Sequence, residues 1–204
     1  MDWATLLTAF VTLFVVIDPV GLAPLFVALT QGSAPAQRRA IALRACGIAG
    51  GVLLLFGLAG EAVLSFAGIS MPAFRIAGGI LLFITALDML FERRTKRRGD
   101  QRARADDPSV FPLATPLIAG PGAIATMILL TSGPNRDAAW IIAVHGVMAA
   151  NIAVCFVLFL GAGILERLLG PTGINVVTRL LGMLLAALSV QFVLDGLSDL
   201  DLSG

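Results

Sequence analysis

The stretch Ile17-Asp18-Pro19-Val20-Gly21-Leu22-Ala23-Pro24 interrupts an apolar segment that runs from Ala4 to Thr30. A second interruption, Ala119-Gly120-Pro121-Gly122, lies near the middle of another apolar segment, from about Phe111 to Thr131. In lipid, the backbone groups freed by a broken helix are tolerated only where protein or a polar cavity satisfies them. Matching interruptions in the two halves of a membrane protein indicate a transport site.

The composition requires lipid as the main solvent for most of this chain. Of its 204 residues, 58% are hydrophobic and 13% are charged, and the mean hydropathy is +0.95. A soluble domain of this size cannot bury so much apolar surface. The sequence therefore predicts an all-α, polytopic membrane protein. Six apolar segments are long enough to span a bilayer: Ala4–Thr30, Ile41–Phe66, Met71–Phe91, Phe111–Thr131, Ala138–Leu165 and Ile174–Leu194.

Basic residues concentrate in one connection, residues 92–108, between the third and fourth spans. The positive-inside rule places such a loop in the cytoplasm, and alternation of the spans then places both termini outside. We interpret the basic loop as a topology signal and expect no nucleic-acid partner.

A sequence pattern occurs twice, which indicates a duplicated unit. The pattern E-x-x-L-x-x-x-G-I, followed by R-x-x-G, runs from Glu61 to Gly78. It recurs from Glu166 to Gly182. We predict two three-helix repeats, residues 1–91 and 109–204, joined by the loop 92–108 within one membrane domain. Because three is odd, the second repeat is inverted, with the first and fourth helices broken.

Each repeat also carries a pair of opposite charges. Glu61 and Arg75 lie at similar distances from the Gly68 turn, and Glu166 and Arg179 at similar distances from the turn Pro171–Gly173. Pairing or placement at the interface lowers the cost of charges in membrane segments. The pairs are interpreted as gates on opposite faces, as structural pins of the helix hairpins, or as long side chains that extend to the interface.

The broken helices supply chemistry for a small polar ligand. Free amide ends can receive a carboxylate, and free carbonyls can receive an ammonium group or a cation. Asp18 could bind a substrate amine, coordinate a cation, carry a proton, or cap the freed amides. The predicted substrate-binding residues lie at the breaks or at polar positions of spans four and five: Asp18, Pro19, Gly21, Pro24, Thr115, Gly120, Pro121, Gly122, Thr126 and Asn151.

Signatures of the common enzyme classes are missing from the sequence. The single histidine, His145, cannot form a two-histidine zinc motif, and neither a G-x-S-x-G elbow nor a P-loop is present. Cys46 and Cys155 lie in apolar helices and are interpreted as small apolar side chains. We therefore expect no enzyme activity, no cofactor and no bound metal ion.

Three segments together resemble the MarC family of bacterial inner-membrane proteins: 18–26, 74–82 and 111–123. The P-L-x-x-P-L-x-x-G-P-G segment that ends at Gly122 is the most specific of them. The resemblance implies a bacterial inner-membrane location and the transport of small neutral amino acids. In such a membrane, the termini that the positive-inside rule places outside would be periplasmic. This chain departs from the family pattern at Asp18, because the family usually has asparagine before the first proline. The additional acid could change the charge of the substrate or the coupling ion.

These observations predict a secondary transporter that moves a small polar solute, in particular a small neutral amino acid, by alternating access. A proton or sodium gradient would drive it, with membrane lipid as the other partner. An ion channel with Asp18 as a selectivity residue is one alternative, and its mark would be large unitary currents. A non-transporting membrane scaffold is another, and it predicts no polar cavity between the halves.

Overall fold

A computed structural model describes residues 3–91, 107–132 and 137–200, and these residues contain helices and no strand. Most of the basic loop 92–108 therefore lies outside the described residues. The elements are α1 (Trp3–Ile17), α2 (Pro19–Leu29), α3 (Pro35–Phe66), α4 (Met71–Leu90), η2 (Ser109–Ile118), α6 (Pro121–Thr131), α7 (Ala138–Leu160) and α8 (Ala162–Ser198). The predicted all-α class is confirmed.

The helices are long and apolar enough to make this an integral membrane protein. Five segments can each cross a bilayer, and α1 with α2 forms one of them, Trp3–Leu29. The helices η2 and α6, which are bent by 53° at the break between them, form either a broken sixth span or a re-entrant loop. The structure therefore supports five or six of the predicted spans, and both predicted interruptions are present as breaks between helices.

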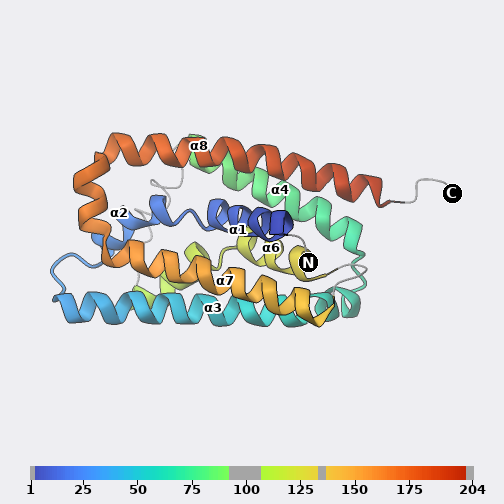
Figure 1. Ribbon diagram of the computed structural model, residues 1–204, viewed down its shortest axis with the longest axis horizontal. Helices are drawn as coiled ribbons and strands as arrows, with labels where there is room; N and C mark the ends of the chain where they lie inside the picture. Colours follow the sequence, from blue (N-terminus) through green and yellow to red (C-terminus); the bar gives the residue numbers. More distant parts are fainter. Residues whose placement is uncertain (1–2, 92–106, 133–136, 201–204) are drawn as a thin grey trace.

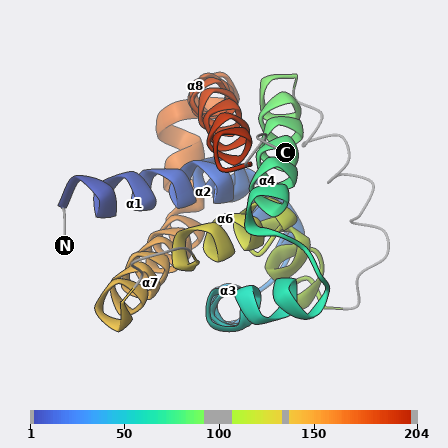
Figure 2. The ribbon, with the colours of Figure 1, turned by 90° about the vertical axis from the view of Figure 1, so that its right-hand side faces the viewer.

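The spans are arranged in three layers, visible in both ribbon views (Figures 1 and 2). The pair α4 and α8 forms one outer layer, and α3 with α7 forms the other. The two broken spans lie between them. In Trp3–Leu29, 61% of the most apolar window is buried, compared with 22% in Ala138–Leu160. The middle layer is therefore shielded by protein, which is the condition for broken helices at membrane depth.

Local sequence signals explain where most of these helices begin. Proline occupies the first turn of α2, α3, α4 and α6, where its missing N–H removes no helical hydrogen bond. Side-chain oxygens also cap the starts of α4 and α7. Ser70 accepts from the N–H of Ala73 at 3.4 Å, and Asp137 accepts from the N–H of Trp140 at 2.8 Å.

The last two spans depart from their predicted boundaries. The helix α7 ends at Leu160, and α8 begins directly after Gly161, so the predicted end at Leu165 is wrong. The turn predicted at Pro171–Gly173 is centred instead on Gly170, whose φ of 62° is a conformation that glycine adopts without strain. The segment 162–169 consequently runs across the end of the bundle, at the left of Figure 1. The rest of α8 then runs along the other long helices.

The α4–α8 layer is a close antiparallel contact between glycine-bearing faces. A Cβ atom built on Gly79 of α4 would lie 2.7 Å from Cγ2 of Val193. One built on Gly182 of α8 would lie 3.0 Å from Cβ of Met89. Small residues thus let the two backbones approach, as is usual between helices in membranes.

Candidate functional site

The first break is organised by Asp18. This residue has a left-handed backbone (φ 54°, ψ 58°), and its side chain is fully buried. Its carboxylate accepts a hydrogen bond of 3.1 Å from the N–H of Gly21, in the first turn of α2. The sequence left four roles open for Asp18, and the structure shows one of them, the capping of α2. The three other roles, toward a solute, a cation or a proton, stay predictions.

Gly21 is required by the position of the Asp18 carboxylate. A Cβ atom on Gly21 would lie 2.2 Å from Oδ2 and 2.8 Å from Cγ of Asp18. The backbone of α2 therefore approaches the carboxylate more closely than any other residue type would permit. Pro19, between them, is buried and brings no N–H that would need a partner.

The second break has no side-chain cap. Gly120 has an extended backbone (φ −78°, ψ 168°), and Pro121 follows as the first residue of α6. A Cβ atom on Gly120 would lie 2.6 Å from the carbonyl oxygen of Pro116, because η2 folds back onto the break. With no capping side chain, the first-turn amides of α6 retain hydrogen-bonding capacity that a ligand could use.

The irregular backbone of η2 has a local cause. Phe111 and Thr115 have extended backbones (ψ 126° and 127°), and each precedes a proline. A residue before proline is disfavoured in the α-helical region. Thr115 consequently lies at a kink of η2, where its side chain is half-buried.

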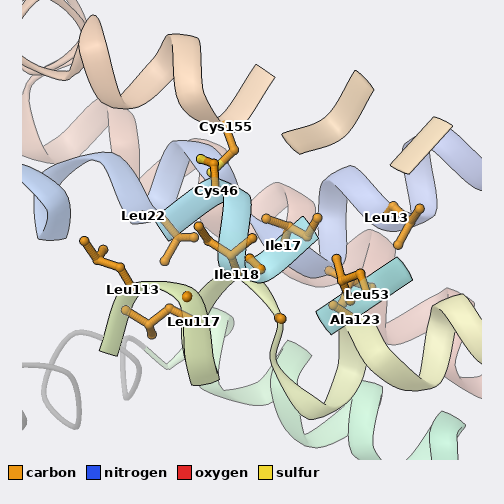
Figure 3. Close-up of a cluster of buried hydrophobic side chains, with 14 of the residues drawn as sticks. Leu13, Ile17, Leu22, Cys46, Leu53, Leu113, Leu117, Ile118, Ala123 and Cys155 are labelled. Carbon is orange, nitrogen blue, oxygen red and sulfur yellow. The ribbon is translucent and has the colours of Figure 1, made fainter. Parts of the chain in front are cut away.

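The two breaks meet in the middle layer. A Cβ atom on Gly122 would lie 3.3 Å from Cγ1 of Val16 in α1 and 3.0 Å from Cδ2 of Leu82 in α4. Val16 is two residues from Asp18, and Gly122 is two residues from Gly120. Figure 3 shows Ile17 and Ile118, the last residues before each break, in the same buried cluster. The structure therefore places Gly122 of the second interruption against α1, two residues before the first interruption.

Two further predicted residues are buried polar groups with unused hydrogen-bonding atoms. Asn151 of α7 donates through Nδ2 to the carbonyl oxygens of Val147 (3.1 Å) and of Phe10 in α1 (3.4 Å), while its Oδ1 has no partner. The hydroxyl of Thr126 in α6 is buried without a partner. Buried polar atoms that lack a partner are rare in folded proteins, so these two atoms are candidates for hydrogen bonds to a bound solute or ion.

The remaining predicted site residue lies farther along the chain. Pro24 is half-buried inside α2, beyond the cap formed by Asp18 and Gly21. The surroundings of the two breaks are mainly apolar, with Val16 and Leu82 against Gly122. At Gly122 the candidate site is therefore covered by these two aliphatic side chains, with the hydroxyl of Thr85 as the nearest polar atom, 3.7 Å from a Cβ atom built on Gly122.

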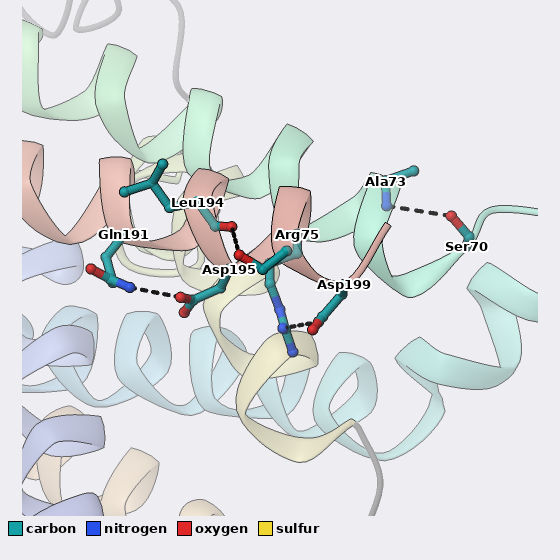
Figure 4. Close-up of polar contacts among 8 residues, drawn as sticks. Ser70, Ala73, Arg75, Gln191, Leu194, Asp195 and Asp199 are labelled. Carbon is teal, nitrogen blue, oxygen red and sulfur yellow. Dashed lines mark hydrogen bonds and ion pairs between the residues drawn. The ribbon is translucent and has the colours of Figure 1, made fainter. Parts of the chain in front are cut away.

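The direct pairing of Glu61 with Arg75, expected if they pin the first hairpin, is wrong, whereas a gating role for either residue stays a prediction. Arg75 pairs with Asp199, near the end of α8, and Figure 4 shows this contact beside the hydrogen bond from Gln191 to Asp195. Glu61 is exposed on α3. The physical reason is that α4 packs along α8 rather than along α3, so that the start of α4 meets the end of α8. The Glu166 side chain lies outside the described part of the chain, and its pairing with Arg179 stays a prediction.

A polar cluster marks the start of the second broken span. Asp107 accepts hydrogen bonds from the hydroxyl (2.7 Å) and the N–H (2.9 Å) of Ser109, and it forms a 3.1 Å ion pair with Arg44 of α3. The Ser109 hydrogen bonds, with a smaller contribution from Arg44, lower the pKa of Asp107 below its usual value.

One pair of residues was missed by reasoning from the sequence. Cys46 and Cys155, interpreted as separate apolar side chains, meet between α3 and α7 (Figure 3). Antiparallel packing of the second span against the fifth would have predicted this contact, but no local sequence signal specifies which helices pack together.

Comparison with known proteins places the whole arrangement in one family. The family model described as MarC family integral membrane protein matches residues 3–200, which include both breaks. The chain belongs to the MarC family. The resemblance carried by the proline and glycine segments is thus confirmed.

Relatives of this MarC chain are similar over almost their full length. A UPF0056 membrane protein of Archaeoglobus fulgidus is 39% identical, with 94% of this chain and 91% of the relative covered. One of Aquifex aeolicus is 36% identical, with coverages of 94% and 92%. The UPF0056 inner membrane protein YhgN of Escherichia coli K12 is 36% identical, with coverages of 94% and 95%. No solved structure matches the chain.

Proposed function

We propose that this MarC protein is a secondary transporter, not an enzyme, that moves a small polar solute by alternating access. The solute class that we propose is a small neutral amino acid, with a proton or sodium ion as the coupling ion. The protein would lie in a bacterial inner membrane with both termini in the periplasm. The single observation that carries the proposal is the contact between two broken spans in the most buried layer of the molecule.

The chemistry of the breaks suits a zwitterion. The first-turn amides of α6, which no side chain caps, favour a carboxylate because a helix N-terminus carries partial positive charge. The Asp18 carboxylate favours an ammonium group. Because Asp18 also caps Gly21, a bound ammonium would share the carboxylate with that amide.

Reciprocal contacts in the α4–α8 layer support an inverted repeat. Counted from Arg75 and Arg179, Met89 and Val193 hold equivalent positions, and Gly79 and Gly182 differ by one residue. Gly79 contacts Val193, and Gly182 contacts Met89. Such an exchange of partners is what a two-fold relationship between the halves would produce.

In this proposal the conformation described above is a closed state. Asp18 is fully buried, and Val16 and Leu82 cover Gly122. A solute would reach the breaks only after the halves shift relative to one another. Alternating access requires such a shift toward each side of the membrane in turn.

The direct test is uptake of a panel of labelled amino acids into proteoliposomes, with and without proton and sodium gradients. We expect saturable, gradient-dependent flux of at least one small neutral amino acid. Asp18→Asn should keep the fold, because asparagine is also a good helix cap, and should shift the pH dependence of flux. The proposal fails if no tested amino acid moves under any gradient. Large unitary currents in planar bilayers would indicate a channel instead.

A further inference from the structure

Two thiols meet in the core between α3 and α7. Cys46 and Cys155 are both buried, and neither is in a disulfide. Figure 3 shows the side chains of Cys46 and Cys155 side by side, with the two sulfur atoms facing each other above Leu22. One cysteine comes from each predicted half of the chain, so this contact lies between the halves.

We propose that Cys46 and Cys155 form an oxidisable dithiol, at which a small uncharged oxidant of the peroxide class joins α3 to α7 through a disulfide bond. The site differs from the breaks of the proposed transport site. It needs no charged oxidant and no protein partner, neither of which could reach sulfur atoms at this depth in the molecule.

The chemistry balances with hydrogen peroxide as the oxidant. Peroxide takes two electrons from the first thiol, which becomes a sulfenic acid, and one water is released. The second sulfur then attacks the sulfenic sulfur, the S–S bond forms, and a second water leaves with the remaining thiol proton. Two thiols and one peroxide give one disulfide and two waters. The starting dithiol and the final disulfide are both uncharged, which suits the apolar surroundings.

The position of the dithiol gives its oxidation a consequence for the molecule. Leu22, which follows Gly21 in the first helical turn after the break, lies beside the two cysteines (Figure 3), so the disulfide would form close to the first break. A covalent link there would hold α3 against α7 and restrain movement of the predicted halves. This effect on flux rests on the proposed function, whereas formation of the disulfide does not.

The test uses the full chain in liposomes, treated with hydrogen peroxide and then alkylated for intact-mass and peptide analysis. We expect both thiols to disappear together, the mass to fall by two hydrogen atoms, and a reductant to restore both thiols. The matched controls are Cys46→Ser and Cys155→Ser, which each keep one thiol. In these controls dimedone should trap the sulfenic acid at least about tenfold more than in the parent, where intramolecular attack removes it.

Two results would overturn the dithiol. One is that both thiols stay free at peroxide concentrations that oxidise the unfolded chain, and the other is that dimedone traps the parent and the controls equally.

Flux separates this inference from the proposed function. We expect oxidation to abolish most of the flux of the parent, reductant to restore it, and Cys46→Ser to be insensitive to peroxide. A disulfide with unchanged flux would refute the restraint on α3 and α7. Absence of flux in the reduced protein as well would refute the transporter while leaving the dithiol established by mass.

Discussion

The first and second broken spans use different means to stabilise the same kind of interruption. At the first, a side chain of the chain itself, Asp18, caps the following helix, and α1 and α2 together still form one span. At the second, no side chain caps α6, and η2 and α6 are bent by 53°. The first break is therefore satisfied locally, whereas the second depends on its neighbours.

This difference suggests that the two breaks have different functions in the candidate site. A capped break in line with its span resists deformation, because its hydrogen bond moves with the helix. An uncapped, bent break leaves amides for a ligand and a hinge of irregular backbone in η2. We infer that the first break provides a fixed charge and that the second provides the adjustable part of the site. Three substitutions test this division.

The largest effect is expected from Gly21→Ala at the first break. The new methyl group would lie 2.2 Å from Oδ2 of Asp18, so the carboxylate must leave its cap. Losing a buried hydrogen bond to a charged group costs about 1.5–3 kcal/mol, and displacing the buried carboxylate adds to this, so we expect the largest loss in the free energy of unfolding of the series. Denaturant unfolding in detergent micelles, followed by circular dichroism, measures it.

The control for Gly21→Ala is Gly47→Ala on α3, where an added Cβ meets no atom within 4 Å. This change should be neutral or stabilise by up to about 1 kcal/mol through helix propensity. In an Asp18→Ala background, Gly21→Ala should lose most of its cost, since the clash is removed. An undiminished cost in that background would show that the carboxylate is not the cause.

An intermediate effect is expected from Gly120→Ala at the second break. The methyl group would lie 2.6 Å from the carbonyl oxygen of Pro116, which is backbone and yields only if η2 moves. Overpacking of this kind costs about 1–3 kcal/mol, and thermal unfolding of the purified protein measures it.

Gly122→Ala is the matched variant for Gly120→Ala. Its methyl group meets the ends of the Leu82 and Val16 side chains, at 3.0 and 3.3 Å, and these can shift. We therefore expect a smaller loss of stability than for Gly120→Ala. The reverse order would mean that η2 is the compliant element and that the aliphatic cover of the site is rigid.

The sequence predicts the spans and the breaks because both depend on local properties. Hydropathy marks the lipid-facing helices, and Pro19, Gly120 and Pro121 interrupt hydrogen bonding wherever they occur. It does not predict whether Asp18 caps a helix or faces a cavity, because the two outcomes differ only in a rotamer and in the packing around it. The cap joins two residues that are only three positions apart in the sequence, Asp18 and Gly21. Whether this hydrogen bond forms depends on the packing of the other helices around it.

Contacts between distant helices account for what the sequence did not predict. The similar distances of Glu61 and Arg75 from the Gly68 turn suggested that these two residues form an ion pair. Because α4 packs on α8, Arg75 instead forms its ion pair with Asp199. The meeting of Cys46 and Cys155 follows in the same way from the packing of α3 on α7. Six apolar helices of similar composition can be arranged in many ways, because lipid exposure discriminates weakly among their faces.

The smallest effect is expected from Ser109→Ala, at the entry to the second broken span. The substitution removes the 2.7 Å hydrogen bond that contributes most to the lowered pKa of Asp107, so this pKa should rise toward its usual value. A carboxyl whose pKa is lowered in the folded state adds stability above its unfolded pKa of about 3.9, and loses it as the pH falls through the folded value. The Asp107 side chain is 40% exposed, and screening by solvent limits this electrostatic contribution to a few tenths of a kcal/mol. Thermal unfolding of parent and variant between about pH 7 and pH 3 should therefore show a small difference in stability at neutral pH, and this difference should vanish in acid.

The control is Arg44→Gln, which removes the weakest of the three contributions that lower the pKa of Asp107. It should give a smaller difference in stability than Ser109→Ala. A difference for Ser109→Ala that is the same at both ends of the pH range would mean that packing of the buried Ser109 side chain, not the charge of Asp107, anchors this end of η2.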